Sequence, residues 1–288
     1  MINWHDRMLT KTRLFLLFQF LFAFFGWIYP PGMPEAGAIA IHQQDAAHQL
    51  PDLQTLPLED LLLLASQNSE KKLLRFSNSV ANLGLGAAEL LGKYDQGKNT
   101  VQISQVVYGS DGSSIIREVG EFSFHREHDH WHWDDFGLYE VWSVSLEGEL
   151  LEQISSSGKV GYCLRDDNPL PGELSGKGLE AERAVYLGCG WRRQGISVGW
   201  MDTYSRNTPG QFVDISGAPD GLYALKSTVD PDNRLLELDE SNNTAVLYFT
   251  LQRNKLQVIG GSITPLPDGP DHPNCYSPNL SDLHLCRY

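Results

Sequence analysis

The stretch FHREHDHWHWDDF, residues 124–136, contains four of the nine histidines of this 288-residue chain. Successive side chains of a β-strand point to opposite faces, so His128, His130 and His132 are expected to share one face. The tryptophans between and after them then face a core. On a straight strand the outer two imidazoles lie about 13 Å apart. A twist or bulge near His130 is therefore expected to bring all three to one ion.

Three imidazoles on one face indicate a metal site. Burying them neutral and unpaired is costly, so histidines that bind nothing are a poor explanation of this pattern. Ligation by imidazoles alone suits copper, zinc, nickel or iron, and the spacing does not choose among these metals. His125 points to the opposite face of a regular strand, so we expect it to support the site without binding the ion.

Composition and charge limit the classes of protein and partner. Hydrophobic residues make up 41% and aromatic residues 10% of the chain, which is enough for a packed core. The formal net charge is −14, so nucleic acid is not expected as a partner.

The first 40 residues have the pattern of a secretory signal peptide. Basic residues precede an apolar run over residues 14–29, and small residues follow it. The run is shorter than the roughly 20 residues of a membrane span, so cleavage is favoured over a retained membrane anchor. Either alternative predicts a secreted or extracytoplasmic protein. Residues 41–49 read as a polar leader.

Export permits disulfides. Four cysteines allow three pairings, and the most local choice joins Cys163 to Cys189 and Cys275 to Cys286. No CxxC pair occurs, so a zinc ribbon is not expected.

The remaining pattern predicts an all-β fold, an antiparallel β-sandwich with long loops and little helix. One short apolar run within residues 50–72 is a candidate helix. We expect one domain over residues 50–260 and an irregular tail over residues 261–288. Short alternating segments bounded by turn residues cover residues 73–84, 99–109, 137–145, 158–164, 211–216, 221–230 and 244–251.

Several segments together resemble the lysyl oxidase family. HREHDHWHWDDFGLYEV resembles the family's copper-binding segment, in which three alternating histidines precede an acidic residue, a Phe and a Tyr. The resemblance covers about residues 50–252. The other matching segments, in the family's order, are LLRFSNSVANLGLGAAEL, KVGYCLRD, GISVGWMDTY and PDGLYALKSTVDPDNRLLELDESNN.

The resemblance implies a copper-dependent amine oxidase. Its copper ligands would be His128, His130 and His132. Its organic cofactor, lysyl tyrosylquinone, would form from Lys159 and Tyr204. With O₂, such an enzyme converts a primary amine, for example a peptidyl lysine, to an aldehyde and releases hydrogen peroxide and ammonia. A general base is also needed, and Asp135 and Asp202 are candidates from sequence proximity.

The resemblance also implies a structural Ca²⁺ site, where an N-terminal Asp-Leu meets the last hairpin. Carboxylate, amide and carbonyl oxygens suit Ca²⁺. Taken alone, DESNN reads as an ordinary acidic turn. The residues implied are Asp52, Leu53, Glu237, Asp239, Asn242 and Asn243.

The chain departs from the animal members at two positions near the histidines. Glu127 stands where they have a cysteine, and Leu138 where they have a histidine. These departures leave the substrate and the disulfide pattern open, and they indicate a shorter, microbial-type member without accessory domains. Two other classes remain: an exported, non-catalytic copper-binding β-sandwich, and an adhesion-like sandwich that binds only calcium.

Overall fold

A computed structural model describes residues 48–57, 60–65, 71–171 and 183–263 of the chain. These residues form β-strands and no helix, so none of them belongs to a helix that could cross a membrane. The all-β prediction is confirmed. The strands are β1 (Leu53–Pro57), β2 (Leu62–Ala65), β3 (Lys72–Arg75), β4 (Asn78–Asn82), β5 (Ala88–Asp95), β6 (Thr100–Tyr108), β7 (Ser114–His125), β8 (His130–Val144), β9 (Leu150–Tyr162), β10 (Asn168–Pro169), β11 (Arg193–Ile196), β12 (Trp200–Tyr204), β13 (Phe212–Asp214), β14 (Gly221–Val229), β15 (Thr244–Gln252) and β16 (Lys255–Ile263).

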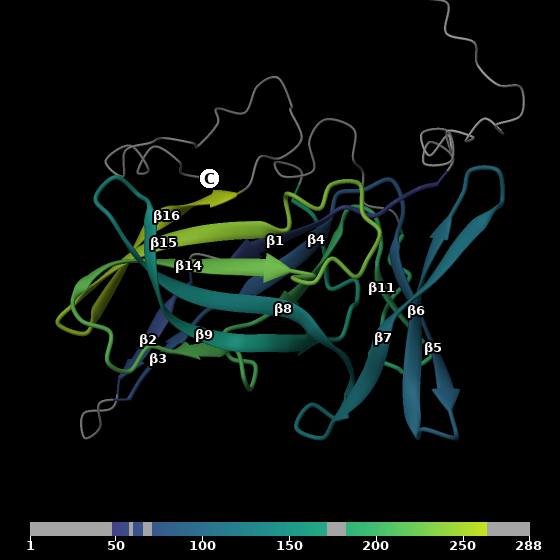
Figure 1. Cartoon of the computed structure of the whole chain (residues 1–288), viewed down its shortest axis with the longest axis horizontal. Helices are drawn as coiled ribbons and strands as arrows, with labels where there is room; N and C mark the ends of the chain where they lie inside the picture. Colours follow the sequence, from purple (N-terminus) through teal and green to yellow (C-terminus); the bar gives the residue numbers. More distant parts are fainter. Residues whose placement is uncertain (1–47, 58–59, 66–70, 172–182, 264–288) are drawn as a thin grey trace, which may run out of the picture. The chain divides into compact units, whose positions relative to one another are not determined.

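The largest sheet has nine strands in the order β11-β5-β6-β7-β8-β14-β15-β16, with β9 also paired to β8 (Figure 1). A four-stranded sheet has the order β1-β4-β12-β10, and a three-stranded sheet the order β13-β3-β2. The pairings are antiparallel, as short strands joined by turns allow. The histidine stretch lies in the large sheet and Tyr204 in the four-stranded sheet.

The two larger sheets share a hydrophobic core, as expected for a sandwich. Strand β1 of the four-stranded sheet packs against β14 and β15 of the large sheet. Leu53 and Val80 belong to the same buried cluster as Leu225 and Phe249. Along β15 buried and half-buried residues alternate, because successive side chains point to opposite faces.

The candidate helix within residues 50–72 is not formed. Its described part contains two strands, and Leu62–Ala65 pairs with Lys72–Arg75 as β2 of the three-stranded sheet. The four residues of β2 are too few for a stable helix, and pairing with β3 satisfies their backbone groups instead. Residues 73–84 are also not one strand, because β3 and β4 join different sheets.

Some predictions concern residues outside the described ranges. The signal peptide and most of the polar leader fall within residues 1–47. The Cys275–Cys286 pair and nearly all of the irregular tail fall within residues 264–288.

Candidate active site

A tight turn, and not a bulge, gathers the histidines. Strands β7 and β8 form a hairpin in which His125 pairs with His130. His128 lies in the turn and donates its backbone N–H to the His125 carbonyl at 3.1 Å. Asp129 adopts the left-handed conformation, with φ of 57°. The turn places His128 beside the first residues of β8, so the predicted bulge near His130 is wrong.

The irregularity of this strand comes later. Its register against β9 shifts between Trp133 and Gly137, where Asp135 has φ of 64°.

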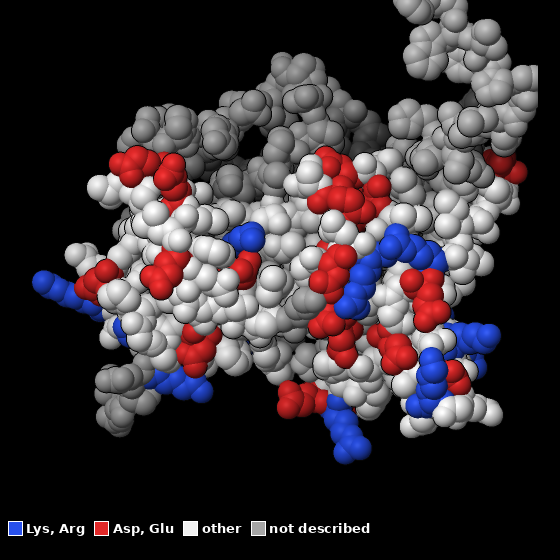
Figure 2. Space-filling view, in the orientation of Figure 1, with Lys and Arg blue, Asp and Glu red and all other residues white. Residues whose placement is uncertain are grey.

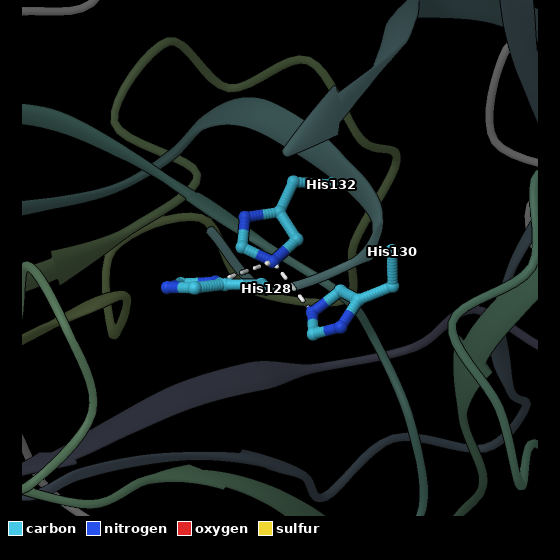
Figure 3. A group of neighbouring side chains, drawn as sticks. All are labelled: His128, His130 and His132. Carbon is cyan, nitrogen blue, oxygen red and sulfur yellow. Dashed lines mark hydrogen bonds between the residues drawn. The ribbon is translucent and has the colours of Figure 1, made fainter. Parts of the chain in front are cut away.

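The three imidazoles converge on one point (Figure 3). His132 Nε2 lies 3.2 Å from His128 Nδ1 and 2.8 Å from His130 Nε2. The potential ligand atoms of all three residues lie within 4.8 Å of one another. This group of nitrogens can therefore hold a single metal ion. Trp133 points the other way and is buried in the core, as predicted.

The local environment favours neutral imidazoles, the form that binds a metal. Burial, followed by the neighbouring imidazoles His125, His130 and His128, lowers the pKa of His132 to about 3. Burial also lowers the pKa of His130, with a contribution from His128.

His125 supports the site, as predicted, without joining the converging nitrogens. Its ring stacks on that of His132, with centroids 4.2 Å apart. Its Nε2 lies 2.9 Å from Asp134 Oδ1. Because Asp134 holds the His125 ring and this ring stacks on His132, these contacts fix the orientation of the His132 ring.

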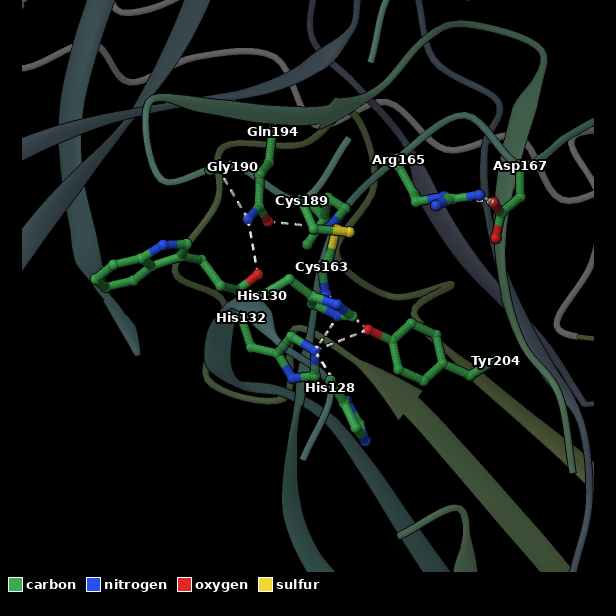
Figure 4. Close-up of a disulfide and its surroundings, with 12 residues drawn as sticks. His128, His130, His132, Cys163, Arg165, Asp167, Cys189, Gly190, Gln194 and Tyr204 are labelled. Atoms are coloured by element: carbon green, nitrogen blue, oxygen red, sulfur yellow. Dashed lines mark hydrogen bonds and ion pairs between the residues drawn. A yellow bond between two sulfur atoms is a disulfide. The ribbon is translucent and has the colours of Figure 1, made fainter. Parts of the chain in front are cut away.

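Tyr204 reaches the histidines from the other sheet (Figure 4). Its hydroxyl oxygen lies 3.4 Å from His132 Nε2 and accepts the backbone N–H of Cys163 at 2.8 Å. Its ring packs on Tyr162, with centroids 4.1 Å apart. Burial, and then the nearby Asp202, raise the pKa of Tyr204, so the phenol keeps its proton in this environment. The site therefore lies between the two larger sheets.

The backbone of Lys159 lies in β9, opposite Leu138 of β8. It is three residues before Tyr162, the residue that packs on Tyr204. The elements that carry Lys159 and Tyr204 thus adjoin each other, and the cross-link between the two residues stays a prediction.

The Cys163–Cys189 disulfide is present, with Cα atoms 5.4 Å apart, which confirms this pairing. Cys189 also accepts the backbone N–H of Trp131 through its carbonyl oxygen at 3.2 Å. The Trp131 carbonyl in turn accepts the Gln194 side-chain amide at 2.8 Å. The disulfide therefore ties the loop before β11 to the end of β9, and the hydrogen bonds of Trp131 tie the same loop and β11 to the histidine strand (Figure 4).

A pocket of about 380 Å³ opens beside the histidines. Sequence reasoning missed Arg165 and Asp167 of its wall, although Arg165 lies in the matched segment KVGYCLRD and Asp167 directly follows it. Of the two candidate bases, only Asp202 lines the pocket, because Asp135 pairs with Arg234 at 3.3 Å. The lining residues are Glu127, His128, His130, Cys163, Arg165, Asp167, Cys189, Asp202, Thr203, Tyr204, Thr208 and Pro209.

The residues predicted to hold calcium form a second cluster. Glu237 accepts the backbone N–H of Leu53 at 2.6 Å and the amide of Asn243 at 3.1 Å. Asn242 donates its amide to Asp52 at 2.8 Å. The four polar side chains are buried, and the side-chain carbonyl oxygens of both asparagines have no hydrogen-bond partner among the residues that the structure describes.

Asp239 differs from the rest of the cluster, because its exposed carboxylate accepts the N–H and hydroxyl of Ser241. Two residues that the sequence did not suggest, Asp230 and Glu240, bring carboxylate oxygens within 4.8 Å of Glu237. Burial raises the pKa of Glu237 well above its ordinary value. Carboxyl groups gathered in this way can hold either protons or a hard cation.

The family model for lysyl oxidase matches residues 104–260, more than half of the chain. The chain belongs to the lysyl oxidase family. The matched region of this family member includes the histidine hairpin, Lys159, Tyr204 and Glu237, but not Asp52 and Leu53.

Individual relatives agree with this assignment. The chain is 27% identical to pig protein-lysine 6-oxidase over 145 residues, which are 50% of this chain and 53% of that protein. It is 29% identical to human lysyl oxidase homolog 1 over 42% of this chain and 19% of the homolog. It is 28% identical to mouse lysyl oxidase homolog 4 over 51% of this chain and 18% of the homolog. This lysyl oxidase family member spans about half the length of the pig protein and a smaller share of the other two.

Proposed function

We propose that this protein is a copper-dependent amine oxidase. It would convert a primary amine to an aldehyde with O₂ and release hydrogen peroxide and ammonia. The observation that carries the proposal is the Tyr204 hydroxyl, 3.4 Å from the converging histidine nitrogens. A copper-binding protein without catalysis has no need of a phenol at this position.

The donor set fits copper. Three neutral imidazoles with nitrogens facing one point are a suitable ligand group for it, and His128, His130 and His132 would hold the ion. The open pocket on the side of His128 and His130 leaves room for O₂ and substrate.

Tyr204 and Lys159 would together form the lysyl tyrosylquinone, which accepts the electrons of the amine when it is formed. The chain's own groups prepare Tyr204 for this role. The Cys163 N–H fixes the position of its oxygen, and Tyr162 fixes the plane of its ring. The pocket wall gives an amine access to one side of the ring.

The substrate class that we propose is a primary amine carried by a cationic molecule, such as a lysine side chain of an exported protein. The pig relative is named for action on protein lysine. Acidic side chains gather in clusters on the face shown in Figure 2, whereas basic ones lie mostly toward its edge. The net charge of −14 attracts basic partners. On this proposal the protein is secreted, and residues 50–260 form its catalytic domain.

The test uses protein that is expressed with copper and purified in air. We expect a coloured phenylhydrazine adduct, which reports the quinone, and peroxide release with an alkyl primary amine. Lys159→Ala should keep its copper and lose both signals, whereas Lys93→Ala, a surface control in β5, should keep both. Bound copper without an adduct in the unaltered protein would favour the non-catalytic alternative.

We further propose that the second cluster binds Ca²⁺ through Asp52, the Leu53 carbonyl, Glu237, Asp239, Asn242 and Asn243. The unpartnered buried oxygens of Asn242 and Asn243 support this proposal, because a cation would satisfy them. The ion would join the start of β1 to the loop before β15, and so link two sheets. Asp239 would have to turn from Ser241 to take part.

Calcium should therefore stabilise the fold. At a free concentration 100 times its dissociation constant, Ca²⁺ is expected to add about 2.7 kcal/mol, or about 5–10 °C in Tm for a domain of this size. Glu237→Gln should remove most of this shift, because Gln lacks the charge that holds the ion. Calorimetry with Ca²⁺ and with EDTA measures the effect. Asp214→Asn, an exposed acid in β13, is the control, and an equal shift in the Glu237 variant would contradict the site.

A further inference from the structure

Asp202 is a buried carboxyl group without a hydrogen-bond partner. It lies on β12 two residues before Tyr204, so both side chains project from the same face of the strand. Asp202 is only 1% exposed, and neither of its carboxylate oxygens has a partner within the described structure. It nevertheless lines the pocket beside Tyr204.

A structural role does not account for this group. The backbone of Asp202 is held by pairing with Val80 of β4, which needs no carboxyl group. A buried carboxyl group without partners destabilises the folded protein, and natural proteins retain such groups mainly at functional sites.

A neighbouring ion pair adds a fixed negative charge. Asp167 forms an ion pair with Arg165 and accepts the backbone N–H of Thr203 at 3.2 Å. These contacts hold the Asp167 carboxylate beside the Asp202 side chain. Burial, and then the negative charge of Asp167, raise the pKa of Asp202 well above its ordinary value.

The groups that face Asp202 come from the segment after β9 and from β8, β9 and β12. Asp167 and Arg165 lie in that segment, and three phenols complete the surroundings, two of them buried and that of Tyr204 half-buried. The titratable and charged groups are Asp167, Arg165, Tyr139, Tyr162 and Tyr204. Because the only cation in this set is paired with Asp167, the environment favours a proton on Asp202 over a bare negative charge.

We propose that Asp202 is the catalytic base, the group that takes the proton from the amine-bearing carbon of the substrate. The Arg165–Asp167 pair acts as its positioning partner. This assignment rests on the proposed amine oxidase function. In the step that Asp202 would serve, the C–H bond of the substrate breaks and its proton binds a carboxylate oxygen of Asp202. The cofactor, once formed, would accept the electron pair of that bond, and O₂ would be the final oxidant, taking up two electrons and two protons to give hydrogen peroxide.

The environment suits this role. A carboxylate whose pKa is raised toward the operating pH is a stronger base than an ordinary Asp. A positioned base contributes about 10²–10⁴-fold to a reaction rate. Asp202 lies two residues before Tyr204 in β12, and both residues line the pocket. Asp202 is therefore on the side of the Tyr204 ring that faces the pocket.

The test compares Asp202→Asn with Asp135→Asn, which removes the same charge outside the pocket. Asp202→Asn should keep copper and the phenylhydrazine adduct, and its kcat should fall by about 10²–10⁴-fold. A substrate deuterated at the amine-bearing carbon should show a larger isotope effect on kcat in this variant, because proton removal then limits the rate. Asp202→Ala should regain part of its rate with added formate, which can enter the space left in the pocket. Asp167→Asn should shift the pH profile of kcat/KM to lower pH without removing its acidic limb.

Two outcomes would overturn the assignment. One is a kcat within about threefold of the unaltered protein, far short of the loss of a base. The other is an Asp202→Asn variant that binds copper but forms no adduct, since Asp202 would then act in making the cofactor. If the unaltered protein itself forms no adduct, the amine oxidase function fails, and a second measurement still decides whether Asp202 carries a proton.

That measurement is the pH dependence of unfolding. A raised folded-state pKa means that the folded protein loses stability as pH rises above the ordinary range of an Asp, because the buried group must then lose its proton. Asp202→Asn should make this fall smaller, because other buried carboxyl groups with a raised pKa, such as Glu237, still contribute to it. Asp135→Asn should leave the fall unchanged. Parallel curves for the unaltered protein and Asp202→Asn would refute the proton-carrying role.

Discussion

Tyr204→Phe is expected to abolish peroxide release from a primary amine while leaving copper bound. The three imidazoles that would hold the ion are unchanged, and Phe fills nearly the same volume against Tyr162. What is lost is the phenol oxygen beside His132, without which no quinone can form. Enzymes accelerate reactions by at least about 10⁶-fold, so a loss of 10³-fold or more is expected in kcat/KM. A coupled peroxide assay and metal analysis of the same preparation measure both quantities.

The matched control for this variant is Tyr94→Phe. It removes a phenol oxygen that lies on the exposed surface and donates to Asn99. This change should leave peroxide release within experimental error. Full peroxide production by Tyr204→Phe would show that the quinone assignment is wrong, and the exported copper-binding protein would become the better explanation.

His132→Ala is expected to lose most of its copper. His132 contributes the nitrogen nearest to both other ligand atoms, and it is the most buried of the three histidines. Loss of a residue that supports a ligand weakens metal binding by about 10–100-fold. Loss of the ligand itself should weaken copper binding by more than this. The phenylhydrazine adduct should disappear with the metal. Copper per chain, measured by mass spectrometry after dialysis against a weak chelator, gives the result.

His125→Ala separates ligation from support. It removes the ring that stacks on His132 but none of the converging nitrogens. Its copper affinity should fall by no more than about 10–100-fold. Equal copper content in the His132 variant and the unaltered protein would exclude the three-histidine site.

Local sequence determined much of this protein. The alternation of apolar and polar residues predicted about half of the strands, because the period of two in a strand is a property of the backbone itself. The spacing of the histidines predicted that they lie together, since residues so close in sequence cannot be far apart in space. The most local cysteine pairing, Cys163 with Cys189, is also the one formed.

Tertiary structure decided how these parts combine. Convergence of the histidines depends on a turn with Asp129 in the left-handed conformation, which the alternating pattern concealed. Asp135 and Asp202 look alike in sequence, yet one pairs with Arg234 and the other lies buried without a partner. Tyr204 meets His132 only because two sheets pack together. Side-chain periodicity is a local property that a short window of sequence contains, whereas contacts between sheets depend on pairings across the whole chain, which no local window specifies.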